Sequence, residues 1–340
     1  MRSSQVTIKD LAKQLGISPS TVSRALKDHP DISEETKKAV KELAQQLKYQ
    51  PNAVALSLKH SRSHTIGVII PEIVHYFFSQ VISGIEDVAY DAGFTVIICQ
   101  SNEMFDREVS NAKALLSHRV DGILVSISKE TSDFEHLRNV EDGNIPMVFF
   151  DRVCPEIEAD AVIIDDYQAA YDATQHLIEQ GCKRIAHFAG PLNLIIGRKR
   201  KEGFIQALKD YNIPVYEDLI VEADSFETGH QTVKQLFKGP DRPDSLFAVN
   251  DLTAIGAIQA IHELGLKIPD DVAVTGFSDG RFSNIVNPKL TSVDQHGYEM
   301  GKTATEILLK RIMEDQREYT PETRVLKGNL IVRNSSVKKS

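Results

Sequence analysis

The 340-residue sequence lacks the features of membrane, secreted and disulfide-bonded proteins. It has no apolar run of about eighteen residues, so it predicts no membrane-spanning helix. Its first residues, MRSSQVTIKD, lack the apolar stretch of a secretory signal. The three cysteines, Cys99, Cys154 and Cys182, are an odd number and lie far apart. These absences predict a cytoplasmic protein with reduced cysteines and no cysteine metal site.

The motifs of common α/β enzymes are also missing. There is no GxGxxG, GxSxG or HExxH, and the histidines form no cluster. GYEMGKT, residues 297–303, resembles a phosphate-binding loop, but three residues instead of four separate its glycines, which removes one backbone N–H from the cradle. SISK, residues 126–129, has the spacing of a serine nucleophile motif without its companion motifs. We therefore expect no enzyme, no cofactor and no metal.

Charge is distributed unequally along a chain whose net charge is −9. Residues 1–62 hold 11 Lys and Arg against 6 Asp and Glu, a net charge of +5. The remaining residues hold 28 against 42, a net charge of −14. A small basic segment on a large acidic body suggests that the segment binds a polyanion, although a solvated basic face explains the charge alone equally well.

Residues 6–48 carry only helical signals. A capping-box pattern begins a helix at Thr7, and Gly16 predicts its end. Ser18 followed by Pro19 predicts the start of a second helix, because proline at the first helical position leaves no N–H unpaired. The three residues between these helices indicate a helix-turn-helix motif, for which a plain three-helix bundle is the alternative.

The second helix, Ser18 to Arg24, would be the recognition helix. Short hydroxyl side chains allow close approach to phosphates, and Arg24 can reach base edges. With the basic charge, this motif predicts a DNA-binding domain over residues 1–49. Residues 50–63, which include most of the polar stretch SRSH at residues 61–64, are expected to link this domain to the larger segment of residues 64–340.

From residue 65 onward, short apolar runs alternate with amphipathic helical segments. TIGVII, FTVIICQ and GILVSI begin a βαβαβ series, and their apolar character predicts parallel strands covered on both faces. About ten or eleven strands are too many for one small parallel sheet, so we predict two doubly wound lobes. We expect a first lobe of about 64–161 and 294–322, and a second of about 162–293 and 323–340.

From Val6 to Lys59 the chain resembles the DNA-binding segment of the lactose/galactose (LacI-type) repressor family. The similarity continues through IGVIIP, DGILVS, IPMVFFDR, HLIEQGCKRIAHFAGP, RKEGFIQAL, RPDSLFAVND and PKLTSVDQ and covers essentially the full length. Members are dimeric transcription regulators whose core resembles periplasmic sugar-binding proteins. The resemblance implies a hinge helix and linker over residues 50–63 and an effector-binding and dimerisation core over residues 64–340. It also implies a repressor that binds near-palindromic operator DNA as a homodimer and responds to a small carbohydrate effector.

The resemblance also implies roles for residues of the first segment. Positions that touch the DNA backbone are matched by Thr7, Ser18, Thr21, Ser23 and Asn52, and base-reading positions by Pro19, Ser20 and Arg24. Pro19 departs from the family because it offers no donor, so base reading is expected to rely on Ser20 and Arg24. In PNAVALSLK, residues 51–59, Leu58 matches a leucine that enters the minor groove and Ala55 the contact between paired hinge helices. An ordinary linker helix is the alternative, and the segment is too short to be stable alone.

In the core, the resemblance implies an effector site between the lobes. It is matched by Phe77, Phe78, Ser126, Asp151, Arg200, Asn250, Ser278, Asp279 and Gln295. These residues lie after strands or at helix starts, where open α/β sheets bind ligands. Phe77 and Phe78 have a plain core role as the alternative, whereas Arg200 is expected to be functional because a charge at a cleft needs a partner. Leu194 and Ile196 stand where purine-binding members carry polar contacts, so a purine is not the expected effector.

No heptad repeat follows VRNSS, so a dimer is favoured over a tetramer. Two other classes remain as alternatives. A solute-binding or sugar-processing protein would use the core alone and would need a secretory signal or catalytic residues. A structural DNA-binding protein would show no effect of a small molecule on its affinity for DNA.

Overall fold

The computed structural model describes residues 6–49, 62–313 and 320–338. The chain divides into two compact units, Met1–His64 and Thr65–Ser340, which are considered separately. The hinge residues Asn52, Ala55 and Leu58 lie outside the described residues. Among the residues described, no helix is both long and apolar enough to cross a membrane.

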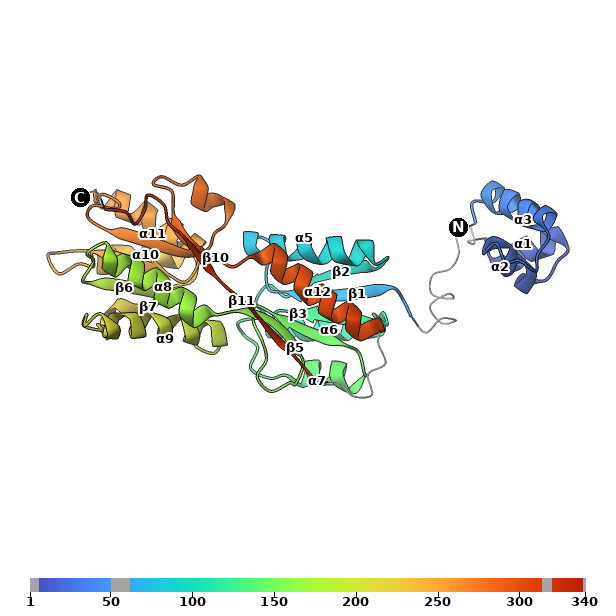
Figure 1. The fold of residues 1–340 in the computed structure, drawn as a ribbon, viewed down its shortest axis with the longest axis horizontal. Coiled ribbons are helices and arrows are strands. Elements are labelled where there is room, and N and C mark those ends of the chain that lie inside the picture. The colour runs from blue at the N-terminus through green and yellow to red at the C-terminus, as the bar shows by residue number, and fades with distance from the viewer. Residues whose placement is uncertain (1–5, 50–61, 314–319, 339–340) are drawn as a thin grey trace. The chain divides into compact units, whose positions relative to one another are not determined.

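The first unit is a bundle of three helices: α1 (Ile8–Leu15), α2 (Pro19–Leu26) and α3 (Glu34–Gln46) (Figure 1). Gly16 ends α1 in the left-handed region, at φ +67°, where glycine is not strained. The Ser18 hydroxyl begins α2 by accepting from the backbone N–H of Thr21. The centre of the bundle is filled by Leu11, Val22, Ala25 and Val40, all fully buried. The predicted three-residue turn and both helix starts are confirmed.

The second unit contains two lobes. The first lobe consists of β1 (Thr65–Ile70), α5 (Tyr76–Asp91), β2 (Thr95–Gln100), α6 (Phe105–Ser117), β3 (Gly122–Val125), α7 (Glu135–Asp142), β4 (Met147–Phe150), β5 (Asp160–Ile164), α12 (Gly297–Met313) and β11 (Thr323–Leu326). The second lobe consists of α8 (Asp166–Glu179), β6 (Ile185–Ala189), α9 (Ile195–Asp210), β7 (Ile220–Glu222), α10 (Phe226–Leu236), β8 (Ser245–Ala248), α11 (Asp251–Glu263), β9 (Ala273–Ser278), β10 (Thr291–Asp294) and β12 (Asn329–Ile331).

Each lobe is built on a six-stranded sheet. The strand orders are β11-β5-β4-β3-β1-β2 and β12-β10-β9-β8-β6-β7. All neighbours are parallel except β10 and β12, which are antiparallel. Helices lie over both faces of the sheets (Figure 1), and β1 and β3 are buried as their apolar runs predicted. The prediction was wrong for β2, which lies at a sheet edge and is partly exposed. The predicted pair of doubly wound lobes is confirmed.

The lobe boundaries differ from those expected. The chain crosses between lobes after β5, β10 and β11, whereas residue 161 lies inside β5. The segment 323–340 was assigned to the second lobe, but β11 pairs with β5 in the first sheet. β11 and β12 have only four and three residues and lie at sheet edges, where β11 is largely exposed and β12 partly buried. They therefore lack the apolar run that marks a central strand, and the sequence did not predict them.

Two glycines let α5 and α12 approach closely across the first lobe. A Cβ on Gly301 would overlap the backbone carbonyl of Val81, and one on Gly84 would overlap that of Tyr298. Because both obstacles are backbone atoms, a side chain at either position would force the helices apart.

We predict that Gly301→Ala lowers the free energy of unfolding by about 1–3 kcal/mol, the usual cost of overpacking. Gly280→Ala is the control, because the nearest atom to its Cβ, Asp251 Oδ2, is 3.5 Å away. Urea denaturation followed by circular dichroism measures both, since the chain has no tryptophan. A Gly301→Ala midpoint equal to that of wild type would show that the helices are not held at this distance.

Candidate DNA-reading helix and ligand cleft

The polar face of α2 carries the residues predicted to read DNA. The exposed ones are Ser18, Pro19, Ser20 and Arg24, while Thr21 and Ser23 are half-buried. Thr7 is exposed at the start of α1, where its N–H and hydroxyl donate to Asp10 at 2.8 and 2.7 Å. The opposite face of α2 is buried in the bundle. The first unit thus presents one face of α2 to a partner.

Three hydroxyls gather at the N-terminus of α2. The Ser18 oxygen lies 2.7 Å from that of Ser20 and 2.9 Å from that of Thr21. A helix N-terminus carries partial positive charge and favours phosphate groups. A hydroxyl has one donor and two acceptor sites, so Ser20 keeps hydrogen-bonding capacity for DNA beside its contact with Ser18.

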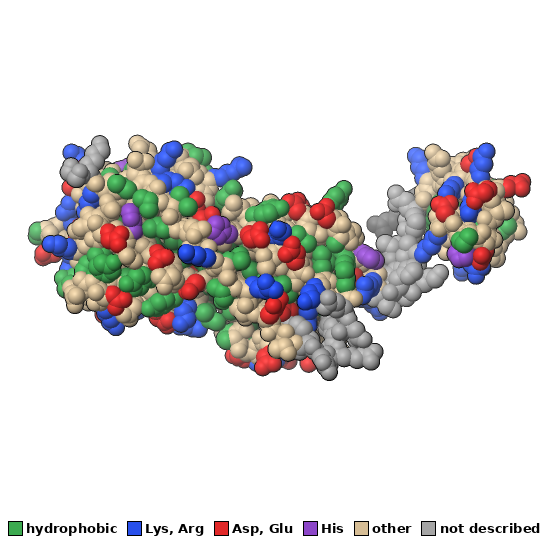
Figure 2. Space-filling view, in the orientation of Figure 1, with side chains coloured by type: hydrophobic (Ala, Val, Ile, Leu, Met, Phe, Trp, Pro, Cys, Tyr) green, Lys and Arg blue, Asp and Glu red, His purple; other side chains and the backbone are tan. Residues whose placement is uncertain are grey.

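On the side of the second unit seen in Figure 2, acidic and basic side chains are interspersed, with apolar side chains between them.

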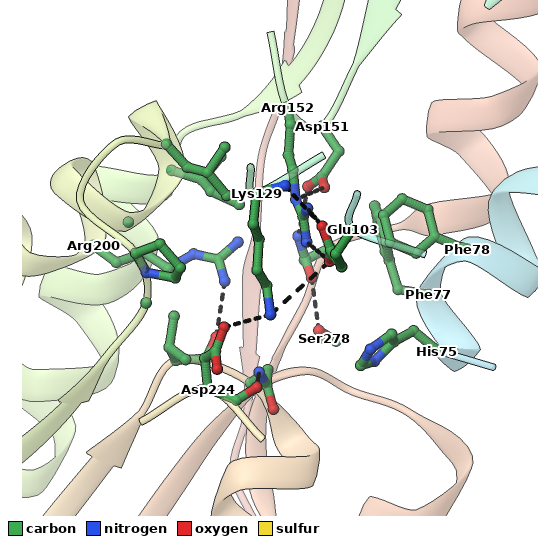
Figure 3. A pocket seen from close by; sticks show the side chains of 18 residues that line it. His75, Phe77, Phe78, Glu103, Lys129, Asp151, Arg152, Arg200, Asp224 and Ser278 are labelled. Carbon is green, nitrogen blue, oxygen red and sulfur yellow. Dashed lines mark hydrogen bonds and ion pairs between the residues drawn. The ribbon is translucent and has the colours of Figure 1, made fainter. Parts of the chain in front are cut away.

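A cavity of about 90 Å³ lies between the two lobes, at the carboxyl ends of strands from both sheets (Figure 3). Seven of the nine residues predicted to bind the effector line it, namely Phe77, Phe78, Asp151, Arg200, Asn250, Ser278 and Gln295. Phe77 and Phe78 pack edge to face with ring centres 5.2 Å apart. Leu194 and Ile196 extend the apolar wall.

A chain of four charged side chains crosses this cavity (Figure 3). Arg152, after β4, donates to both oxygens of Glu103, after β2, at 2.7 and 3.1 Å. Lys129, after β3, places Nζ 4.0 Å from Glu103 and 2.5 Å from Asp224 Oδ2. Asp224 follows β7 in the second lobe. We call Arg152, Glu103, Lys129 and Asp224 the charge chain; it joins the lobes by an ion pair.

Asp151 is a buried carboxylate without a short hydrogen bond to a side chain. It is 6% exposed and adopts φ +59° after β4. Gln295 Nε2 donates to it at 3.5 Å, and Arg152 Nε lies 3.8 Å away. Burial raises the pKa of Asp151, and the charges of Arg152 and Arg200 oppose that rise. The carboxylate can therefore accept hydrogen bonds from a ligand in the cavity.

The buried guanidinium of Arg200 is paired with the carboxylate of Asp166. Its Nε donates to Asp166 at 2.7 Å and its Nη1 to the carbonyl of Val249 at 2.8 Å. The guanidinium lies 3.7 Å from the centre of the Phe277 ring. Burial raises the pKa of Asp166 to about 6, although the Arg200 charge opposes this. These contacts fix the guanidinium and leave Nη2 available to a ligand.

Asn250 and Ser278 are held by other residues of the cavity wall. Asn250 Nδ2 donates to the carbonyl of Asp224 at 2.8 Å, while Oδ1 accepts from Thr253 N at 2.9 Å and so caps α11. Ser278 donates to Gln295 Oε1 at 2.8 Å. These bonds connect the second lobe, through Gln295, to Asp151 in the first.

Comparison with known proteins decides the family. Residues 7–52 match the family described as bacterial regulatory proteins, lacI family. Residues 63–331 match periplasmic binding proteins and sugar binding domain of LacI family. The chain belongs to the LacI family.

Relatives of this LacI-family chain cover nearly its whole length. The HTH-type transcriptional repressor PurR of Actinobacillus pleuropneumoniae serotype 3 (strain JL03) is 35% identical over 97% of this chain and 98% of its own. The ribose operon repressor of Halalkalibacterium halodurans is 36% identical over 90% of each. This chain is accordingly a DNA-binding transcription regulator with a ligand-binding core.

Solved structures of transcription regulators share the fold. The lac repressor dimer bound to operator and the anti-inducer ONPF matches with a TM-score of 0.85 and 27% identity, over 98% of this chain and 100% of that one. The transcriptional regulator CelR–cellobiose complex matches with a TM-score of 0.74 and 28% identity, over 97% and 100%.

The structure does not bring two of the expected effector residues of this LacI-family chain to the cavity. Asp279 instead accepts from Arg333 at 2.6 and 3.0 Å. The backbone turns at this point, with φ +115° at Ser278 and +47° at Asp279, so Ser278 lines the cavity while the Asp279 carboxylate pairs with Arg333. Ser126 is fully buried after β3, and its hydroxyl has no hydrogen-bond partner among the described residues.

Sequence reasoning missed His75 and five charged residues around the cavity, namely Glu103, Lys129, Arg152, Asp166 and Asp224. Each follows a predicted strand by a few residues. The rule that ligands bind at the carboxyl ends of strands applies to all of them, so the position was a usable signal. The sequence carries no signal for which of these residues pair with each other, because the partners lie far apart along the chain.

Proposed function

We propose that the protein is a transcription repressor that binds a near-palindromic operator as a homodimer in the cytoplasm and catalyses no reaction. Its operator affinity is controlled by a small sugar or sugar derivative bound between the lobes. Supporting this, relatives are named as repressors, and one similar structure is a lac repressor dimer on its operator. A solute-binding role for the core alone leaves the match of residues 7–52 unexplained.

On the DNA side, the exposed polar face of α2 supports base reading by Arg24 and Ser20. The hydroxyls of Thr7, Ser18, Thr21 and Ser23 are suited to phosphate contacts. Asn52, Ala55 and Leu58 stay proposals drawn from the family resemblance: a backbone contact, a contact between hinge helices, and insertion of Leu58 into the minor groove.

On the ligand side, the observation that carries the proposal is the buried Asp151 carboxylate, which faces a cavity without a short hydrogen bond to a side chain. A carboxylate beside a fixed guanidinium suits vicinal hydroxyls, which donate to one and accept from the other. The Phe77 and Phe78 rings offer apolar surface to the carbon face of a sugar ring. Similar structures hold cellobiose and ribose, which supports this ligand class.

A purine remains the less favoured effector despite the relatives named PurR. Leu194 and Ile196 line the cavity and offer no donor or acceptor to ring nitrogens. Leaving those nitrogens unpaired in a closed site would cost binding free energy.

We predict that Arg24→Ala weakens operator binding by about 1–3 kcal/mol and relaxes sequence preference at one position of each half-site. Lys9→Ala, on exposed α1, is the control for a lost basic charge. Binding to operator and to unrelated DNA is measured at several salt concentrations. An equal loss on both DNAs would show that Arg24 contacts only phosphates.

We predict that thermal-shift screening of the full chain finds a stabilising sugar, because a ligand at 100 times its Kd adds about 2.7 kcal/mol of stability. Asp151→Asn should weaken that sugar by about 1.5–3 kcal/mol, the worth of hydrogen bonds to a charged acceptor. A protonated carboxyl accepts less well, so wild-type affinity should fall as the pH is lowered through the raised pKa of Asp151.

Isothermal titration at several pH values tests this prediction. The Asp151→Asn variant should lose the part of the pH dependence that Asp151 contributes. Wild-type affinity in Asp151→Asn would exclude the carboxylate from the site, and a panel without any stabilising sugar would contradict the proposed effector class.

A further inference from the structure

Every cation that faces the cavity is already paired with a carboxylate of the protein. The three pairs are Lys129 with Asp224, Arg152 with Glu103, and Arg200 with Asp166, at 2.5, 2.7 and 2.7 Å. The cavity histidine, His75, lies 2.9 Å from Glu72. Among the described lining residues, therefore, no cationic side chain is left without an acidic partner.

Carboxylates also outnumber cations here. Asp151 is a fourth acidic group beside the three cations, and its nearest basic atom in the structure, Arg152 Nε, is 3.8 Å away. An anionic ligand would meet the carboxylates of Asp151, Glu103 and Asp224 in a partly buried space, where like charges repel more strongly than in water.

The Lys129–Asp224 pair is fixed from both sides. Asn193 Nδ2 donates to the carbonyl of Lys129 at 2.5 Å, and Asn250 Nδ2 donates to the carbonyl of Asp224 at 2.8 Å. The two side chains are 31% and 21% exposed, so both remain accessible from the cavity. The backbone of Lys129 is thus held by a residue of the second lobe, and the backbone of Asp224 by a residue of its own lobe.

We propose that these pairs make the cleft selective for uncharged polyols against phosphorylated or carboxylated ones, with Asp224 as the specificity-determining residue. The proposal rests on the proposed function, because it names the ligand class of the same site. A hydroxyl can accept from a remaining N–H of Lys129 and donate to Asp224 without breaking the pair. A phosphate must replace Asp224 as the partner of Lys129 while the carboxylate stays close by.

The test needs no knowledge of the natural effector. Ribose 5-phosphate, glucose 6-phosphate and inorganic phosphate are titrated against the full chain, with thermal stability and calorimetry as readouts. Wild type should show no saturable binding at millimolar concentration. Asp224→Asn removes the nearer acid of Lys129 and leaves only the 4.0 Å contact with Glu103. This variant should bind at least one of the three anions at least about tenfold more tightly than wild type does, with an affinity that falls as salt is added.

Two controls locate the effect. Glu263→Gln removes an acid that lies 2.6 Å from Lys234, an ion pair outside the cavity, and should gain no anion binding. Adding Lys129→Met to Asp224→Asn should abolish the gain. Asp224→Ser repeats the test with a smaller side chain, and circular dichroism identifies any variant that does not fold.

Saturable binding of a sugar phosphate to wild type that Lys129→Met abolishes would overturn the proposal. So would folded Asp224→Asn and Asp224→Ser proteins that gain no anion binding. If an uncharged sugar binds wild type but neither variant gains anion binding, only the selectivity proposal fails. If the variants gain anion binding but no sugar stabilises wild type, the exclusion of anions by Asp224 stands, whereas the polyol ligand class fails together with the proposed function.

Discussion

A charge between two packed lobes is stable only if it is paired, and this constraint organises the ligand cleft. Asp166 holds Arg200, Glu103 holds Arg152, and Asp224 in the second lobe holds Lys129 in the first. Removing water from an unpaired charge costs several kcal/mol. Separating a pair would leave such a charge, so each pair holds together the two segments that carry it. Asp151 departs from this pattern, since no basic atom comes closer to it than 3.8 Å in the structure. The three ion pairs hold the walls of the cavity in place, and the Asp151 carboxylate is left to accept hydrogen bonds from a ligand.

The sheet topology explains why so many such residues meet in one place. Parallel strands end at the same edge, and the two sheets direct their carboxyl ends toward a common cavity. The chain crosses between lobes after β5, β10 and β11, so a ligand that contacts both lobes favours one arrangement of them. It can act on DNA binding only through its different affinities for the arrangements available to the core. The ion pair between Lys129 and Asp224 also favours one arrangement of the lobes, because it exists only while the two loops that carry it are close.

Local features of this protein were predictable from sequence, and long-range ones were not. The cap at Ser18, the turn at Gly16 and the apolar central strands depend on neighbouring residues, so their patterns are visible directly. β11 and β12 escaped prediction because edge strands of three or four residues are too short to show an apolar run. Family resemblance placed Asp151, Arg200 and Gln295 in one site, and the cavity contains all three. It did not reveal that Asp166 would pair with Arg200 or that Asp224 would cross to Lys129, since those pairs depend on how distant strands are brought together.

The central claim is that ligand binding in the cleft and operator binding by the first segment are coupled. Linkage requires the coupling to be reciprocal: if a sugar changes operator affinity by some factor, operator must change sugar affinity by the same factor, commonly about 5–150-fold. The direct measurement is a calorimetric titration of the stabilising sugar into the full chain, alone and saturated with operator DNA. We expect the two sugar affinities to differ by the factor by which the sugar changes operator affinity. Identical sugar affinities with and without operator would contradict the account.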